Sequence, residues 1–171
     1  MVPGDCRPAQ RASRGRIAAL REHLAAIGAE ALLVPSADPH LSEYLPDRWQ
    51  GRRWLSGFTG SQATLVVAAH KAALFADSRY WEQAEAELAG SGVDLVKIPN
   101  AGSTLHLEWL ARELPKGAVV TVDGQVLGLG AASALRATLD TAGIALRTDV
   151  DLLDAVWGGR FVGEAALSSR I

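Results

Sequence analysis

Apolar segments of strand length and of helix length alternate along the second half of the chain, and this alternation constrains the fold most. Short apolar runs of strand length occur at residues 93–98, 118–122 and 144–147. Segments with apolar residues at helical spacing separate them, at residues 103–114 and 131–142. Strands that alternate with helices form largely parallel sheets whose two faces are covered by the helices. The sequence therefore predicts an α/β fold.

The first half of the chain adds a helix, an antiparallel pair of strands and a second helix to this architecture. Its helical segments show apolar spacings of three and four or a high content of helix formers, and its strands are short apolar runs. The predicted elements are a helix at residues 14–27, a strand at 31–34, a hairpin of 63–69 and 72–76, and a helix at 80–88.

Size, charge and cysteine content exclude several classes of protein. The 171 residues suit one compact domain. The 17 basic and 19 acidic residues give a net charge of -2, which offers no excess positive field for nucleic acid. Cys6 is the single cysteine, so no intrachain disulfide forms, and we expect a reducing, cytoplasmic setting. The sequence has neither an apolar run near the ~20 residues of a membrane-spanning helix nor an apolar signal segment in residues 1–13.

The stretch from residue 35 to 62 is too long for an ordinary connection, and it follows the first strand, where open α/β sheets usually bind ligands. Asp38, His40 and Glu43 lie close together in it and supply two carboxylates and an imidazole, enough in kind for a metal site or an acid/base pair. No HExxH, EF-hand or CxxC pattern accompanies them, so polar loop residues without bound metal are the favoured interpretation. Trp49 and Trp54 lie among arginines on the same stretch and are candidates for an interaction surface.

Arg79 follows a predicted strand and precedes a predicted helix, a position from which a guanidinium reaches into a cleft. The alternative is a surface arginine paired with Asp77 or Glu82. The histidines outside the long stretch, His23, His70 and His106, are expected to be solvated.

Three motifs, in this order and at these spacings, resemble the N-terminal domain of aminopeptidase P, in the creatinase and prolidase superfamily. They are DPHLSEYLPDR, RRWLSGFTGS and ALFADSRYWEQAEAEL. The similarity continues through VTVDGQVL and DLLDAVWGGR and covers about residues 14–160. It implies a three-layer α/β/α domain with a mixed sheet, a flexible segment at residues 1–13 and a divergent tail at 161–171.

The resemblance also implies a function. Members are cytoplasmic metallopeptidases that remove an N-terminal residue preceding proline, usually with manganese at a two-metal centre in a separate catalytic domain of pita-bread fold. In this family the N-terminal domain supports substrate access and subunit contacts, and the arginine that matches Arg79 can approach the peptide. His40 is a second candidate for substrate contact, although the segment with Asp38, His40 and Glu43 is not among the metal ligands.

We therefore expect an accessory domain that binds no metal, is inactive alone, and partners the family's catalytic domain or an intact peptidase subunit, with proline-containing peptides as substrates of the full enzyme. A homodimer, a stand-alone interaction module and a small hydrolase using Asp38, His40 and Glu43 are the alternatives.

Overall fold

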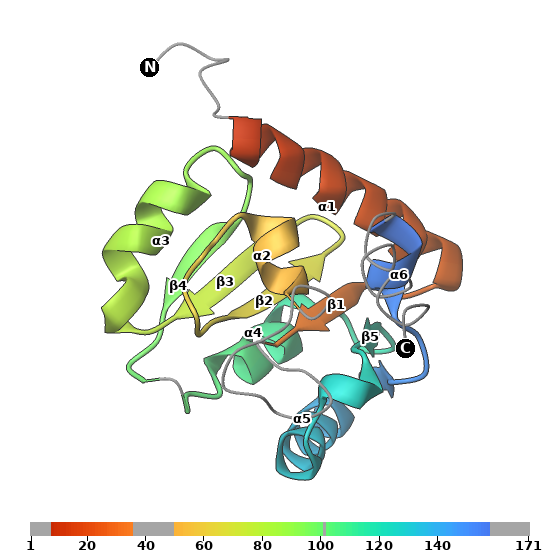
Figure 1. Cartoon of the computed structure of the whole chain (residues 1–171). Helices are drawn as coiled ribbons and strands as arrows, with labels where there is room; N and C mark the ends of the chain where they lie inside the picture. Colours follow the sequence, from red (N-terminus) through yellow and green to blue (C-terminus); the bar gives the residue numbers. More distant parts are fainter. Residues whose placement is uncertain (1–7, 36–49, 101, 158–171) are drawn as a thin grey trace, which may run out of the picture.

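The strand and helix segments of the sequence form three layers, with one mixed sheet between two layers of helices (Figure 1). The computed structural model describes residues 8–35, 50–100 and 102–157. The sheet has the strand order β4-β3-β2-β1-β5-β6. Its strands are β1 (Ala31–Val34), β2 (Thr64–Ala68), β3 (Ala72–Ala76), β4 (Asp94–Lys97), β5 (Val119–Thr121) and β6 (Ala145–Arg147).

Five of these strands run in the same direction, and among the described strands only β2 opposes them. β2 pairs in antiparallel fashion with both β1 and β3, whereas the pairs β3–β4, β1–β5 and β5–β6 are parallel. The predicted largely parallel sheet with one hairpin is therefore confirmed. As a consequence, the carboxyl ends of β1, β3, β4, β5 and β6 lie along one edge of the sheet, called the carboxyl edge below.

Alternate residues of the central strands divide the core into two halves. Leu32, Leu65 and Leu74 point to one side, and Leu33, Val66 and Phe75 to the other. The helices that cover the first face are α1 (Pro8–Ile27), α2 (Gly51–Ser56), α3 (Trp81–Leu88) and α6 (Leu152–Val156). The second face is covered by α4 (Leu105–Glu113) and α5 (Leu129–Thr141). Two short 3₁₀ turns, η2 (Ser78–Tyr80) and η3 (Gly124–Val126), follow β3 and β5.

Helix α1 begins earlier than the sequence predicted, because polar contacts rather than an apolar stripe hold its first turns. Residues 8–13 were assigned to a flexible segment, yet they are helical, and Gln10 and Ser13 are buried. Gln10 Nε2 donates a hydrogen bond to the Glu87 carbonyl, 2.9 Å away, at the end of α3. Gln10 thereby links α1 to α3. Because Gln10 is polar, the spacing of apolar residues could not predict this contact.

Two short helices were not predicted. Helix α2 lies in the long stretch assigned as a loop, and α6 follows β6. Helices of six and five residues are too short to show an amphipathic period. They form here because Leu55, Leu152 and Leu153 are buried against the first face of the sheet.

His106 is not solvated as expected, because its ring packs 6.1 Å from the ring of Phe75 and is half-buried. Burial lowers the pKa of His106, against a smaller opposing effect of a hydrogen bond with the Ser103 backbone. Since the unfolded chain binds the proton more tightly, folding stability should fall as the pH drops below about 6.5 and level off below the folded pKa.

We therefore predict that His106→Gln reduces the loss of unfolding free energy between about pH 7.5 and about pH 5.5. Urea denaturation at the two pH values measures this loss, and the exposed His70 provides a matched control in His70→Gln. An unchanged pH dependence in His106→Gln would show that the burial of this ring does not couple to protonation.

Candidate functional site

The carboxyl edge brings together the segments that leave the parallel strands. Pro35 follows β1, Asp77 follows β3 and Asp123 follows β5, so groups far apart in sequence share one side of the domain. The chain leaves β1 toward helix α2 on the first face and leaves β5 toward helix α5 on the second. Parallel neighbours whose connections go to opposite faces form a topological switch point, where open α/β sheets usually bind ligands.

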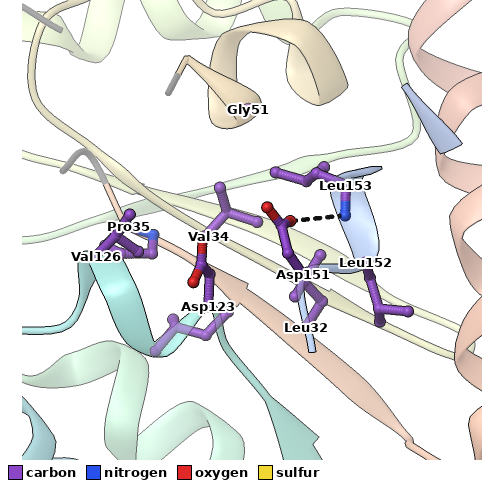
Figure 2. Close-up of a pocket in the computed structure, with 10 residues that line it drawn as sticks. Leu32, Val34, Pro35, Gly51, Asp123, Val126, Asp151, Leu152 and Leu153 are labelled. Atoms are coloured by element: carbon purple, nitrogen blue, oxygen red, sulfur yellow. Dashed lines mark hydrogen bonds between the residues drawn. The ribbon is translucent and has the colours of Figure 1, made fainter. Parts of the chain in front are cut away.

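A small pocket lies at this switch point (Figure 2). Its apolar walls come from β1, η3 and α6, and Gly51 at the start of α2 closes one side. Asp123 and Asp151 are its acidic residues, and both carboxylates cap helical turns. Asp123 accepts from the Gln125 N–H at 2.9 Å, and Asp151 accepts from the Leu153 N–H at 3.1 Å, the bond dashed in Figure 2. The carboxylates therefore serve the local backbone, and this pocket is an apolar hollow with capped turns at its rim.

Arg79 lies on η2, directly after β3, on the same edge. Its Nε and Nη2 donate to the two carboxylate oxygens of Asp77, each at 2.9 Å. The Arg79 side chain is 59% exposed, whereas that of Asp77 is only 6% exposed. This ion pair raises the pKa of Arg79 and lowers the pKa of Asp77. The largest cause of both shifts is the side-chain hydrogen bonding between the two groups. The Arg79–Asp77 pair expected as the alternative is present, and the guanidinium still faces open solvent.

Asp77 fixes Arg79 through the backbone as well. Its Oδ1 accepts from the Arg79 N–H at 3.1 Å and caps the first turn of η2. The Arg79 guanidinium also lies 5.1 Å from the centre of the Tyr80 ring. A cation held by a buried carboxylate and an aromatic ring keeps one orientation, and Arg79 Nη1 has no hydrogen bond to the described residues. This nitrogen is therefore a donor that can bind a carbonyl or carboxylate from outside the domain.

The SGFTGS segment forms a tight turn beside Tyr80. Gly57 ends α2 in the left-handed region, with φ of 77°. Phe58 is fully buried and meets the Tyr80 ring edge to face at 5.8 Å, and Ser61 Oγ lies 2.7 Å from Tyr80 Oη. The glycines thus serve a close turn, and the segment forms no phosphate loop.

Gly60→Ala is predicted to destabilise the domain by about 1–3 kcal/mol, because the added methyl overpacks the core. A Cβ atom on Gly60 would overlap the Phe58 ring and lie 2.9 Å from Tyr80 Cδ1. Gly130 in α5 is a matched control, since a Cβ there meets nothing within 4 Å. Gly130→Ala should leave stability unchanged or raise it by up to about 1 kcal/mol. Chemical denaturation of both variants measures the difference, and equal stabilities would contradict the packing described for Gly60.

The Trp54 side chain is half-buried because its ring stacks on another ring, so it is not fully exposed to solvent. Its ring lies 5.0 Å from that of Trp157 at an interplanar angle of 16°, and the Arg16 guanidinium lies 4.7 Å from its centre. Arg16 Nη1 also donates to the Trp54 carbonyl at 2.8 Å. These contacts join α1 and α2 to the residue after α6, and they were not visible in the spacing of the tryptophans.

Asp38, His40, Glu43 and Trp49 lie outside the described residues, so their predicted roles stay predictions. Within residues 8–35, 50–100 and 102–157, no group of three or more His, Cys, Asp or Glu side chains is arranged to hold a metal ion. The described helices include none long and apolar enough to cross a membrane.

Comparison with known proteins agrees with this architecture. Residues 16–161 match the family described as the creatinase/prolidase N-terminal domain. Xaa-Pro aminopeptidase 2 of Rattus norvegicus is 35% identical over 144 residues, which are 84% of this chain and 21% of the relative. Aminopeptidase P2 of Arabidopsis thaliana is 35% identical over 133 residues, 77% of this chain and 19% of the relative. The chain therefore spans about a fifth of the length of these relatives.

Solved structures show the same fold. The X-prolyl aminopeptidase of Caenorhabditis elegans, described as a cytosolic enzyme with a di-nuclear active site, superposes with a TM-score of 0.78 at 34% identity. The match covers 86% of this chain and 26% of that enzyme. The N-terminal domain of the peptidase PepQ from Mycobacterium tuberculosis shares the fold, with a TM-score of 0.65 at 22% identity over 84% of this chain and 98% of that domain. The chain belongs to the creatinase/prolidase N-terminal domain family and corresponds to the N-terminal domain of Xaa-Pro aminopeptidase-like proteins.

Proposed function

We propose that this domain is the accessory part of an Xaa-Pro aminopeptidase and that it presents Arg79 to the peptide substrate beside a separate catalytic domain. The observation that carries the proposal is the exposed guanidinium at the carboxyl edge, held in one orientation by the buried Asp77. A peptide offers carbonyl oxygens, which accept hydrogen bonds from a guanidinium, and a terminal carboxylate, which a guanidinium binds more strongly. His40 is the second candidate for substrate contact.

Metal chemistry belongs to the catalytic domain in this proposal. Two manganese ions would activate the attacking water there, while the described residues of this domain offer no metal site. The di-nuclear active site of the Caenorhabditis elegans relative supports this division of labour. The 171 residues by themselves are expected to be inactive. We also propose a cytoplasmic location, because the Caenorhabditis elegans relative is described as cytosolic.

A fusion tests the proposal. This domain is joined to the Caenorhabditis elegans enzyme in place of the part that it matches, and the enzyme lacking that part is the reference. The fusion should release the first residue of an Xaa-Pro-Xaa peptide with a kcat/KM at least about tenfold above the reference, because correct substrate orientation lowers the barrier. A folded fusion that is no faster than the reference would refute the accessory role.

We propose subunit contact as a second role, through the surface that Trp54, Trp157 and Arg16 form. The Trp54–Trp157 stack with Arg16 at its side combines aromatic and cationic groups, which are common at protein interfaces. A homodimer should then dissociate in Trp54→Ala, and light scattering measures its mass.

A further inference from the structure

Arg52 is a buried cation, and none of the ion pairs found among the described residues includes it. The residue is 7% exposed, on the side of α2 that faces the core. Its Nη2 donates to the Gly60 carbonyl, whereas Nε and Nη1 are buried and have no hydrogen-bond partner among the described residues. Its guanidinium lies 5.2 Å from the centre of the Phe58 ring. Burial lowers the pKa of Arg52 to about 10.

A half-satisfied buried arginine is a poor way to stabilise a fold. Donors that leave water without a new partner cost free energy, and an apolar side chain of similar volume would avoid this cost. Natural proteins break the rule of satisfied buried polar groups mainly at functional sites. The partly satisfied guanidinium of Arg52 therefore points to a functional role.

The contact that Arg52 makes lies in the turn of residues 57–61. Ser56 closes the start of this turn, since its Oγ donates to the Arg52 carbonyl at 2.6 Å and accepts from the Phe58 N–H at 3.1 Å. Glu87 holds the other side by accepting from the Thr59 N–H and hydroxyl. The turn is thus fixed between an arginine of α2 and a glutamate of α3.

The turn of residues 57–61 also fixes the position of the Tyr80 side chain. Phe58 contacts the Tyr80 ring edge to face, Gly60 lies against it so closely that no Cβ fits, and Ser61 Oγ is within hydrogen-bond distance of its hydroxyl. The Tyr80 ring also contacts the guanidinium of Arg79, which lies 5.1 Å from the ring centre. One continuous series of contacts therefore runs from Arg52 through the turn and Tyr80 to the proposed substrate donor.

We propose that Arg52 is a positioning residue for Arg79, acting through the turn of residues 57–61 and the ring of Tyr80. This inference rests on the proposed function of Arg79, and its geometric part is testable without any turnover. Arg52 touches neither substrate nor metal in this role.

Amide hydrogen exchange in the 171-residue protein tests the geometric part. Arg52→Met keeps a long, unbranched side chain, shorter than that of arginine, and removes the donors. Exchange at Phe58, whose N–H donates to Ser56 Oγ, and at Tyr80, whose N–H donates to the Asp77 carbonyl, should accelerate roughly 10- to 100-fold, the loss expected for one hydrogen bond to a charged group. The NMR signal of Arg79 Nε–H should shift. Amides of α4 and α5, on the far face of the sheet, should change less than about threefold. Arg52→Lys should restore part of the protection, and the exposed Arg136 provides the control variant Arg136→Met.

The same variants in the fusion enzyme test the functional part. Arg52→Met should lower kcat/KM about tenfold with Arg79 present and should have no further effect in an Arg79→Ala background, because both changes act through one group. Equal acceleration of exchange in all helices, or no acceleration at Phe58 and Tyr80, would overturn the positioning role. If Arg79→Ala lowers kcat/KM and Arg52→Met does not, this inference fails and the proposed function stands. If Arg79→Ala has no effect, the proposed function of Arg79 fails, and the functional part of this inference fails with it.

Discussion

Arg79→Ala in the fusion enzyme is expected to lower kcat/KM for an Xaa-Pro-Xaa peptide by roughly 10- to 100-fold. This is the range expected when a hydrogen bond from a charged group to the substrate is lost. Arg79 Nη1 is the donor that the Asp77 ion pair leaves available.

Arg147 provides a matched control for this change. It lies at the end of β6 on the same carboxyl edge and forms the same kind of two-bond ion pair, with Asp149 two residues later, at 3.0 and 3.1 Å. Arg147→Ala should leave kcat/KM within about twofold, since surface ion pairs contribute little by themselves. An equal loss in both variants would show that turnover responds to the charge of the edge rather than to Arg79.

The stability of Arg79→Ala distinguishes a substrate contact from a structural one. Because Asp77 is buried, removing its guanidinium partner should lower Tm at neutral pH. The pKa of Asp77 is lowered in the folded protein, so its stabilising effect is present above the ordinary carboxyl pKa and is lost as the pH falls through the folded one. The Tm difference between the two proteins should therefore shrink in acid. A large loss of Tm with intact turnover would mean that Arg79 is structural.

Phe75→Ala should destabilise the domain by about 3–5 kcal/mol, the usual cost of removing a buried aromatic side chain. Phe75 is 1% exposed in β3, and its ring meets those of His106 and Trp109 edge to face, each at 6.1 Å. A loss of this size corresponds to a drop in Tm of about 6–20 °C for a chain of this length.

Leu129 is the matched control, because it is 90% exposed at the start of α5. Leu129→Ala should change stability by less than about 0.5 kcal/mol. Urea denaturation measures both variants, and a similar small effect for Phe75 would show that the second half of the core does not stabilise the fold.

The sequence predicted those elements whose signal is hydrophobic periodicity. Helix 14–27, the buried strand 31–34 and the hairpin needed only the spacing of apolar residues, and the structure contains all three. Helices α2 and α6 were missed because each buries only one or two leucines, so their stability comes from tertiary packing. His106 was expected to be solvated because the residue spacing within its own helix does not show its contact with the Phe75 ring, which belongs to another element.

The candidate site was predicted only in part. Arg79 was proposed as a substrate contact from its position after a strand and from the family resemblance, and that role stays a prediction. Arg52 was treated as one of several loop arginines, because its burial depends on Phe58 and Gly60, which contact it only after the turn has formed. Sequence spacing reports which face a residue occupies on its own element, and it does not report contacts between elements.

The release of the first residue from an Xaa-Pro-Xaa peptide, measured with the purified 171-residue protein and added Mn²⁺, tests the accessory role most directly. We predict no release above the buffer rate from this protein alone, and release from the fusion under the same conditions. Mn²⁺-dependent release by the protein alone, abolished in His40→Ala, would contradict the account and favour a small hydrolase built on the Asp38, His40 and Glu43 segment.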